Sequence, residues 1–274
     1  MTETSPSAPV RIAAIQTVSG PDVAANLETA ARLIAEAAAA GARLVALPEY
    51  FPLISKDEAA KVRIREPEGA GPLQDFLAAE ARRHGVWLIG GTLPLVAEAD
   101  DKVRNSTLVY DDQGRRVARY DKIHLFGFQR GEERYDEAAT IEPGSTVACF
   151  DSPAGRTGLS VCYDLRFPEL FRSMGEVDLI VLPAAFTWTT GRAHWEVLLR
   201  ARAIENQYYL MAPAQGGRHE SGRVTWGHTM IFDPWGEILA CRDEGPGVVL
   251  AEIDHARLAA VRESLPALRH RCLA

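Results

Sequence analysis

Short apolar runs of strand length alternate with helical segments along the chain, and this alternation limits the fold more than any other feature of the sequence. In the first half, two amphipathic helices separate the apolar runs, and Gly85 follows the second helix as a stop signal. The expected elements of this half are strands 10–17, 44–47 and 87–91, helices 26–40 and 72–84, and a hairpin of 105–110 with 116–120.

The second half repeats this order, and one strand-then-turn pattern occurs in both halves, as VYDDQG at 109–114 and as IFDPWG at 231–236. Its expected elements are strands 157–162, 179–182, 208–212, 229–232, 238–241 and 247–253, helices 168–174 and 193–206, and a last helix capped by Asp254. Each half is therefore expected to supply a sheet backed by helices. We predict an α/β fold of two mixed β-sheets flanked by helices, with residues 10–274 as a single domain after a flexible N-terminus, residues 1–9.

Composition and missing motifs exclude several classes of protein. The net charge of −7 argues against binding to nucleic-acid phosphates. No apolar run reaches the roughly 18–20 residues that a membrane span requires. The four cysteines form no CxxC pair and have no zinc-like spacing, and there is no P-loop, GxGxxG, HExxH or GxSxG motif. The N-terminus has no apolar signal region, so we expect a cytoplasmic protein with reduced thiols.

Cys162 is the first candidate for chemistry, because it ends the apolar strand predicted over 157–162, directly before a short predicted helix. In α/β folds, this edge of the sheet carries the functional sites. Backbone N–H groups at the start of the helix would stabilise a thiolate or an oxyanion there. The alternative is a buried, inert cysteine, since free cysteine is among the most buried residue types.

Two charged residues also follow predicted strands. Glu49 comes after the buried-strand run 44–47, and enclosing a carboxylate raises its pKa, as a general base near neutral pH requires. Its alternative is a solvated loop glutamate. Lys122, one of only four lysines, precedes an apolar run that should draw it inward, where a cation would stabilise an oxyanion. Its alternative is a lysine at a strand end that keeps its charge in solvent.

Histidines offer a competing mechanism, because a Cys–His pair is the usual arrangement in thiol hydrolases. His124, His194 and His228 are the candidates, and none of them lies in a local signature.

Taken together, three segments resemble the signature blocks of the nitrilase (carbon–nitrogen hydrolase) superfamily, in the order that the family has them. These are LPE at 47–49, DKIHLF at 121–126 and VCYDLRFPE at 161–169. Any one block is weak evidence, whereas all three together are highly specific. The segments 191–206 and 227–236 resemble the Nit branch of this superfamily. The resemblance extends from Val10 to about Arg271.

The resemblance implies an α-β-β-α sandwich that forms a homodimer or a larger homo-oligomer and uses no metal or cofactor. It also implies catalytic roles. Cys162 would be the nucleophile and Glu49 the general base, while Lys122 and the backbone N–H of Tyr163 would stabilise the tetrahedral intermediate. Glu137, which follows Lys122 at the family's spacing for a second glutamate, would hold that lysine in place.

The resemblance further implies how substrate is bound. Arg166 would take a substrate carboxylate, and Thr187 would line the pocket. The alternative for Arg166 is a structural brace that pairs with Asp164 or Glu169. The segment 127–134 matches characterised members least well, although it borders the pocket in the family.

By this resemblance, the chain is expected to be an amidase that cleaves a small linear amide carrying a carboxylate, through a thioester on the enzyme. Deaminated glutathione is the expected substrate, with 2-oxoglutarate and cysteinylglycine as products, in metabolite repair. The alternatives are an omega-amidase acting on 2-oxoglutaramate and an inactive protein that keeps the fold for binding or scaffolding. No nucleic-acid or membrane partner is expected.

Overall fold

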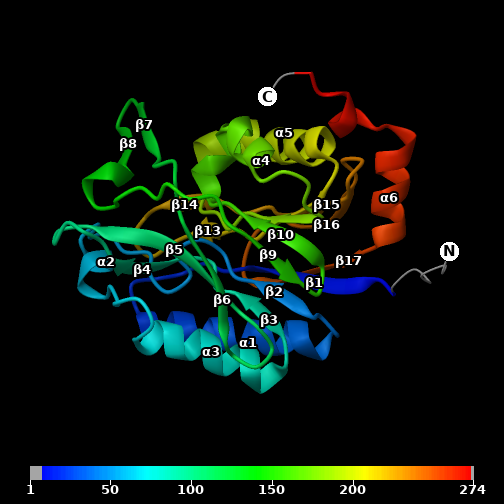
Figure 1. Cartoon of the computed structure of the whole chain (residues 1–274). Helices are drawn as coiled ribbons and strands as arrows, with labels where there is room; N and C mark the ends of the chain where they lie inside the picture. Colours follow the sequence, from blue (N-terminus) through cyan, green and yellow to red (C-terminus); the bar gives the residue numbers. More distant parts are fainter. Residues whose placement is uncertain (1–7, 273–274) are drawn as a thin grey trace.

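The computed structural model describes residues 8–272, so most of the predicted N-terminal segment, residues 1–9, lies outside the described residues. Two β-sheets lie face to face in the middle of the molecule (Figure 1). Helices α1 (Val23–Ala39) and α3 (Pro72–His84) cover one outer face, and α4 (Pro168–Ser173) and α5 (Trp188–Asn206) cover the other. The predicted fold class, two mixed sheets flanked by helices, is confirmed.

The first sheet has a parallel centre. Its strand order is β17 (Gly247–Ile253), β1 (Val10–Gln16), β2 (Leu44–Ala46), β3 (Trp87–Ile89), β5 (Val103–Tyr110) and β4 (Leu93–Val96), and β6 (Arg116–Asp121) pairs with β5. Strands β1, β2 and β3 are parallel, and the remaining pairs are antiparallel. The last strand of the chain, β17, thus lies beside the first, which joins the two halves.

The second sheet has the same plan. Its order is β16 (Ile238–Arg242), β15 (Thr229–Phe232), β12 (Tyr209–Ala212), β11 (Leu179–Val181), β10 (Gly155–Leu159) and β9 (Cys149–Ser152), with β10, β11 and β12 parallel. The two repeated turns are also alike, because Asp111 and Asp233 each accept hydrogen bonds from the backbone N–H groups two and four residues further on. The predicted pair of similar halves is therefore present in the structure.

Alternate side chains of the central strands pack into two different layers. Ile12 and Ala14 of β1 contribute to the core between the sheets, whereas Ala13 and Ile15 contribute to the core beneath α1 and α3. Because both faces of these strands are buried, their sequences read as continuous apolar runs rather than as alternating ones.

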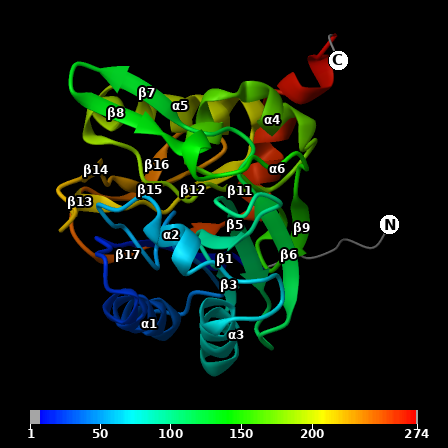
Figure 2. The ribbon, with the colours of Figure 1, turned by 90° about the vertical axis from the view of Figure 1, so that its left-hand side faces the viewer.

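Smaller elements gather at one end of the sandwich. Two short antiparallel ribbons, β7 (Gly127–Arg130) with β8 (Glu133–Asp136) and β13 (Gly216–Arg218) with β14 (Val224–Trp226), lie there with α2 (Ala60–Arg63) (Figure 2). The last described elements are α6 (His255–Ser264), capped by Asp254 as predicted, and a 3₁₀ turn over Ala267–His270.

Three predicted boundaries are wrong by three or more residues. Helix α1 begins at Val23 with Asp22 as its cap, and Asn26 lies inside it, where its side chain bonds the carbonyls of Gly20 and Pro52. Helix α5 begins earlier than predicted, at Trp188. The strand predicted to reach Cys162 ends at Leu159, although Val161 is still extended and the backbone turns only at Cys162, where φ is 49°.

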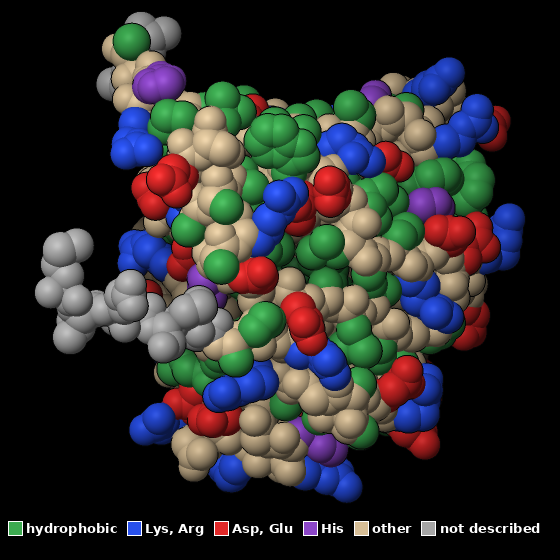
Figure 3. All heavy atoms as spheres, turned by 90° about the vertical axis from the view of Figure 1, so that its right-hand side faces the viewer, with side chains coloured by type: hydrophobic (Ala, Val, Ile, Leu, Met, Phe, Trp, Pro, Cys, Tyr) green, Lys and Arg blue, Asp and Glu red, His purple; other side chains and the backbone are tan. Residues whose placement is uncertain are grey.

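Basic and acidic side chains intermingle with hydrophobic ones over the face shown in Figure 3. In the part of the chain that the structure describes, no helix is both long and apolar enough to span a membrane. Within residues 8–272, no group of three or more His, Cys, Asp and Glu side chains is placed to hold a metal ion.

Candidate active site

Glu49 lies where the first sheet faces the second, three residues beyond the end of β2, and its side chain is fully buried. Its Oε1 accepts hydrogen bonds from Nδ2 of Asn105 and Nζ of Lys122, both at 2.9 Å, and its Oε2 accepts one from the backbone N–H of Ala185 at 2.9 Å. Gly91 permits this path of the chain, because a Cβ there would lie 2.1 Å from the Pro48 carbonyl oxygen. The solvated-loop alternative for Glu49 is therefore wrong.

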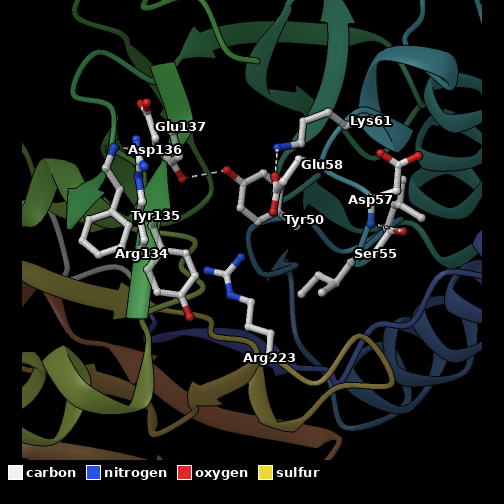
Figure 4. Close-up of a pocket in the computed structure, with 13 residues that line it drawn as sticks. Tyr50, Ser55, Asp57, Glu58, Lys61, Arg134, Tyr135, Asp136, Glu137 and Arg223 are labelled. Atoms are coloured by element: carbon white, nitrogen blue, oxygen red, sulfur yellow. Dashed lines mark hydrogen bonds and ion pairs between the residues drawn. The ribbon is translucent and has the colours of Figure 1, made fainter. Parts of the chain in front are cut away.

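Lys122 joins two carboxylates in the interior. Its Nζ lies 2.9 Å from Oε1 of Glu49 and 2.9 and 2.7 Å from the two oxygens of Glu137. Glu137 also accepts hydrogen bonds from the hydroxyl of Tyr50 at 2.8 Å and the backbone N–H of Phe126 at 2.7 Å (Figure 4). The lysine is fully buried, so the alternative of a strand-end lysine with its charge in solvent is wrong.

The two glutamates differ in proton affinity although they share one lysine. Burial would raise the pKa of Glu137, but the charge of Lys122 and the hydrogen bonds to this carboxylate outweigh burial and lower that pKa. Burial raises the pKa of Glu49, and the charge of Glu137 raises it further against the opposing effect of Lys122. Although burial alone would lower it, the pKa of Lys122 is raised by the charges of both glutamates. These shifts favour an ionised Glu137 paired with a charged Lys122, whereas Glu49 takes up a proton more readily than Glu137 does.

Cys162 adopts an unusual backbone conformation beside this group. Its φ of 49° lies in the left-handed region, which non-glycine residues seldom occupy, and its N–H donates to the carbonyl of Pro183 at 2.9 Å. Burial raises the pKa of the Cys162 thiol well above its usual value, and the charge of Glu49 adds to this effect. This shift in pKa favours the protonated thiol over the thiolate. A short 3₁₀ turn over Cys162–Arg166 separates the cysteine from the predicted helix, α4, which begins at Pro168.

A narrow cavity lies at Cys162 and brings the remaining candidates together. Tyr163, Arg166 and Thr187 all line it. Arg166 stacks over the rings of Tyr163 and Phe186 and lies 3.2 Å from Nδ1 of His194, without a carboxylate at ion-pair distance among residues 8–272. The ion pairs predicted for a bracing role are therefore absent there. The hydroxyl of Thr187 accepts from the backbone N–H of Thr190 and caps α5.

The three histidines considered for a Cys–His pair contact other residues. His124 bonds to Asp164 at 2.7 Å and stacks on Phe167, and His228 stacks on Trp226. His194 contacts Arg166. Among the described residues, no histidine lines the cavity at Cys162.

Sequence reasoning missed several groups at this site. Asn105 and the Ala185 N–H both bind Glu49, and Tyr50 binds Glu137. Asn105 stands in the polar run RNST at 104–107 of β5, so no local pattern singles it out. Arg223, in the turn between β13 and β14, also lines the cavity, and no local pattern marks it.

Comparisons with known proteins agree with this architecture. The carbon–nitrogen hydrolase family model matches residues 11–263. The chain is 41% identical over 264 residues to deaminated glutathione amidase of Yersinia enterocolitica, covering 94% of this chain and 92% of that protein. It is 37% identical over 273 residues to omega-amidase NIT2 of Xenopus tropicalis, covering 95% and 94%.

Two solved structures of the Nit branch have the same fold. The C. elegans NitFhit protein matches with a TM-score of 0.87 and 35% identity, and the match covers 98% of this chain but only 66% of NitFhit. Saccharomyces cerevisiae Nit3, a member of branch 10 of the nitrilase superfamily, matches with a TM-score of 0.85 and 31% identity, covering 98% of both chains. The chain belongs to the carbon–nitrogen hydrolase family and is a hydrolase that acts on amide carbon–nitrogen bonds.

Proposed function

We propose that this hydrolase cleaves deaminated glutathione to 2-oxoglutarate and cysteinylglycine through a thioester on Cys162. The observation that carries the mechanism is the placement of Lys122 Nζ within 3 Å of both Glu49 and Glu137, next to the cavity that Cys162 lines. The relatives named deaminated glutathione amidase support the substrate.

In the first half-reaction, Glu49 takes the proton from Sγ of Cys162 as the sulfur attacks the amide carbon. Lys122 Nζ and the backbone N–H of Tyr163 stabilise the negative charge that develops on the carbonyl oxygen. As the carbon–nitrogen bond breaks, Glu49 gives its proton to the leaving amine, and a thioester remains. The raised pKa of Glu49 suits both the uptake and the release of this proton.

In the second half-reaction, Glu49 takes a proton from water as the water oxygen attacks the thioester carbon. The carbon–sulfur bond then breaks, the acid leaves, and the thiol of Cys162 recovers its proton from Glu49. Throughout the cycle, Glu137 keeps Lys122 charged and in position through its two contacts with Nζ.

Arg166 would set the substrate class, because its guanidinium lines the cavity without a carboxylate partner among the described residues. A carboxylate at the far end of the acyl group can pair with it in two parallel hydrogen bonds, which fixes orientation as well as adding affinity. The 2-oxo acid end of the proposed substrate offers such a group.

We further propose that the protein is cytoplasmic and forms a homodimer or a larger homo-oligomer. A homodimer is supported by large apolar side chains that α5 and the β15–β16 region expose, which are Val197, Ile204, Trp235, Ile238 and Leu239. A cytoplasmic location is supported by the four cysteines, all of which are free in the described structure. The pairing of β17 with β1 supports residues 10–274 as one domain.

An amide panel tests the proposed substrate. Rates are compared for deaminated glutathione, 2-oxoglutaramate and a simple nitrile at equal enzyme concentration. The proposal expects the highest kcat/KM for deaminated glutathione. A higher value for 2-oxoglutaramate would identify an omega-amidase, and absence of turnover on every compound would indicate a protein that keeps the fold only for binding.

A further inference from the structure

A second cavity of about 160 Å³ adjoins the one at Cys162. The two cavities share three lining residues, Phe126, Glu137 and Arg223. Arg166 lines only the cavity at Cys162, whereas the second cavity continues past Arg223 toward Tyr50, Lys61 and Tyr135 (Figure 4). A substrate whose acyl end pairs with Arg166 therefore has room for a sizeable amine portion on the side of Arg223.

Arg223 has unused hydrogen-bonding capacity at this junction. Its Nη2 donates to the carbonyl of Ala185 at 2.8 Å, but its Nε is buried without a hydrogen-bond partner. Its guanidinium points into the cavity between Tyr50 and Tyr135, with ring centroids at 6.0 and 5.4 Å (Figure 4). In the described structure, no carboxylate lies at ion-pair distance from it, and a buried donor left unpaired is costly unless a ligand satisfies it.

The arginine is held by a fixed element. Its turn closes through the N–H of His219, which donates to the Arg223 carbonyl at 2.9 Å. His219 is itself buried, with its ring nitrogens 2.8 Å from the Ser19 carbonyl and 2.7 Å from the Thr225 hydroxyl. A residue on such a support keeps its position when substrate binds, as a specificity-determining group requires.

Most of the carboxylates that line the second cavity are already paired with cations. Lys61 pairs with Glu58 at 2.6 Å, Asp57 pairs with Arg63 at 2.6 Å, and Glu137 is committed to Lys122. Arg134 and Asp136 both line this cavity and are exposed, and neither has an oppositely charged partner at ion-pair distance among residues 8–272, so their charges offset each other.

We propose that Arg223 binds a carboxylate on the amine side of the scissile bond, so that the second cavity selects amides whose leaving group is an anionic peptide-like amine rather than ammonia. This inference rests on the proposed function and names a second recognition site for its substrate. Arg166 and Arg223 would then hold the two ends of one dianionic amide across Cys162.

The test compares three amides that share the 2-oxoglutaryl group and differ in the amine, which is cysteinylglycine, cysteinylglycinamide or ammonia. The enzymes are the wild type, Arg223→Gln, Arg223→Lys and, as a matched control, Arg218→Gln, whose exposed arginine lies on the same ribbon. Ratios of kcat/KM between substrates are taken within each enzyme, so that loss of active protein cancels.

We expect Arg223→Gln to lower kcat/KM for the cysteinylglycine amide by about 10- to 100-fold, with changes below about threefold for the other two amides. Arg223→Lys should lose less, since it keeps the charge, and Arg218→Gln should leave the ratios unchanged. Equal losses on all three amides would overturn the inference and limit Arg223 to holding the Ala185 peptide. No loss on any amide would also overturn it. A wild type that cleaves only the primary amide would instead refute the proposed substrate, and this inference with it.

Discussion

Replacing Glu137 with glutamine should weaken the base at the site without removing it. Glu49 and Glu137 each lie within 3 Å of Lys122 Nζ, so their nearest oxygens are no more than about 6 Å apart. At an effective dielectric constant near 20, two like charges at about 6 Å repel by about 3 kcal/mol. Burial is the main reason that the pKa of Glu49 is raised, and this repulsion adds to it.

In Glu137→Gln the repulsion disappears and Lys122 pairs with Glu49 alone, so the pKa of Glu49 must fall. Because the ionised form of Glu49 is the active base, the acid limb of the kcat/KM profile should move to lower pH. The plateau of kcat/KM should drop by on the order of 10²-fold, since a carboxylate committed to an ion pair is a poor base.

The assay is the pH dependence of kcat/KM for wild type and variant, with thermal melting to show that the variant folds. Glu132→Gln is the matched control, because this exposed glutamate lies in the turn of the β7–β8 hairpin, which ends directly before Glu137. The control should reproduce the wild-type profile. An acid limb that stays in place or moves to higher pH in Glu137→Gln would refute the electrostatic argument.

Three further predictions concern the pair of Glu49 and Lys122, Arg166, and His219. Glu49→Gln and Lys122→Arg should each lower kcat by on the order of 10²-fold or more, and the double variant should be no slower than the worse single one; additive losses would show that one residue is only structural. Arg166→Lys should lower kcat/KM by roughly 1–3 kcal/mol for a carboxylate-bearing amide and hardly affect an uncharged amide of equal length, whereas equal losses on both would make it a brace. Burial lowers the pKa of His219 to about 4 from 6.5, so the unfolded state binds a proton more readily and the free energy of unfolding decreases as pH falls through that interval. His219→Gln should therefore make the free energy of unfolding, measured with urea, less dependent on pH between 6.5 and 4. An unchanged pH dependence would contradict this prediction.

Local sequence signals predicted the elements whose environment is set by their own residues. The run 44–47 is apolar because both faces of β2 are buried, and Gly85 ends α3 in the left-handed conformation, with φ of 61°. The prediction of Asn26 as the cap of α1 was wrong, because its side chain is used in tertiary contacts and donates to the carbonyls of Gly20 and Pro52. The β7–β8 hairpin left no periodic signal, since its strands are mostly exposed.

The sequence predicted those site residues that directly follow a buried strand. Glu49 and Cys162 both follow buried strands, and the structure places them at one edge between the sheets. Glu137 and Arg223 belong to segments that reach the site only through long-range packing. The family resemblance supplied Glu137, whereas Arg223 emerged only from the structure. The catalytic roles of all these residues stay predictions until they are measured.

The central claim is that the amide carbon becomes bonded to Sγ of Cys162, and its most direct test is peptide mass spectrometry of enzyme quenched during turnover of deaminated glutathione. The account predicts a 2-oxoglutaryl adduct on the peptide that contains Cys162 and on no other cysteine peptide. Cys162→Ala should lose the adduct and all but a trace of turnover, while Cys241→Ala, which removes an exposed cysteine, should keep both. An adduct on another residue, or substantial turnover by Cys162→Ala, would contradict the account.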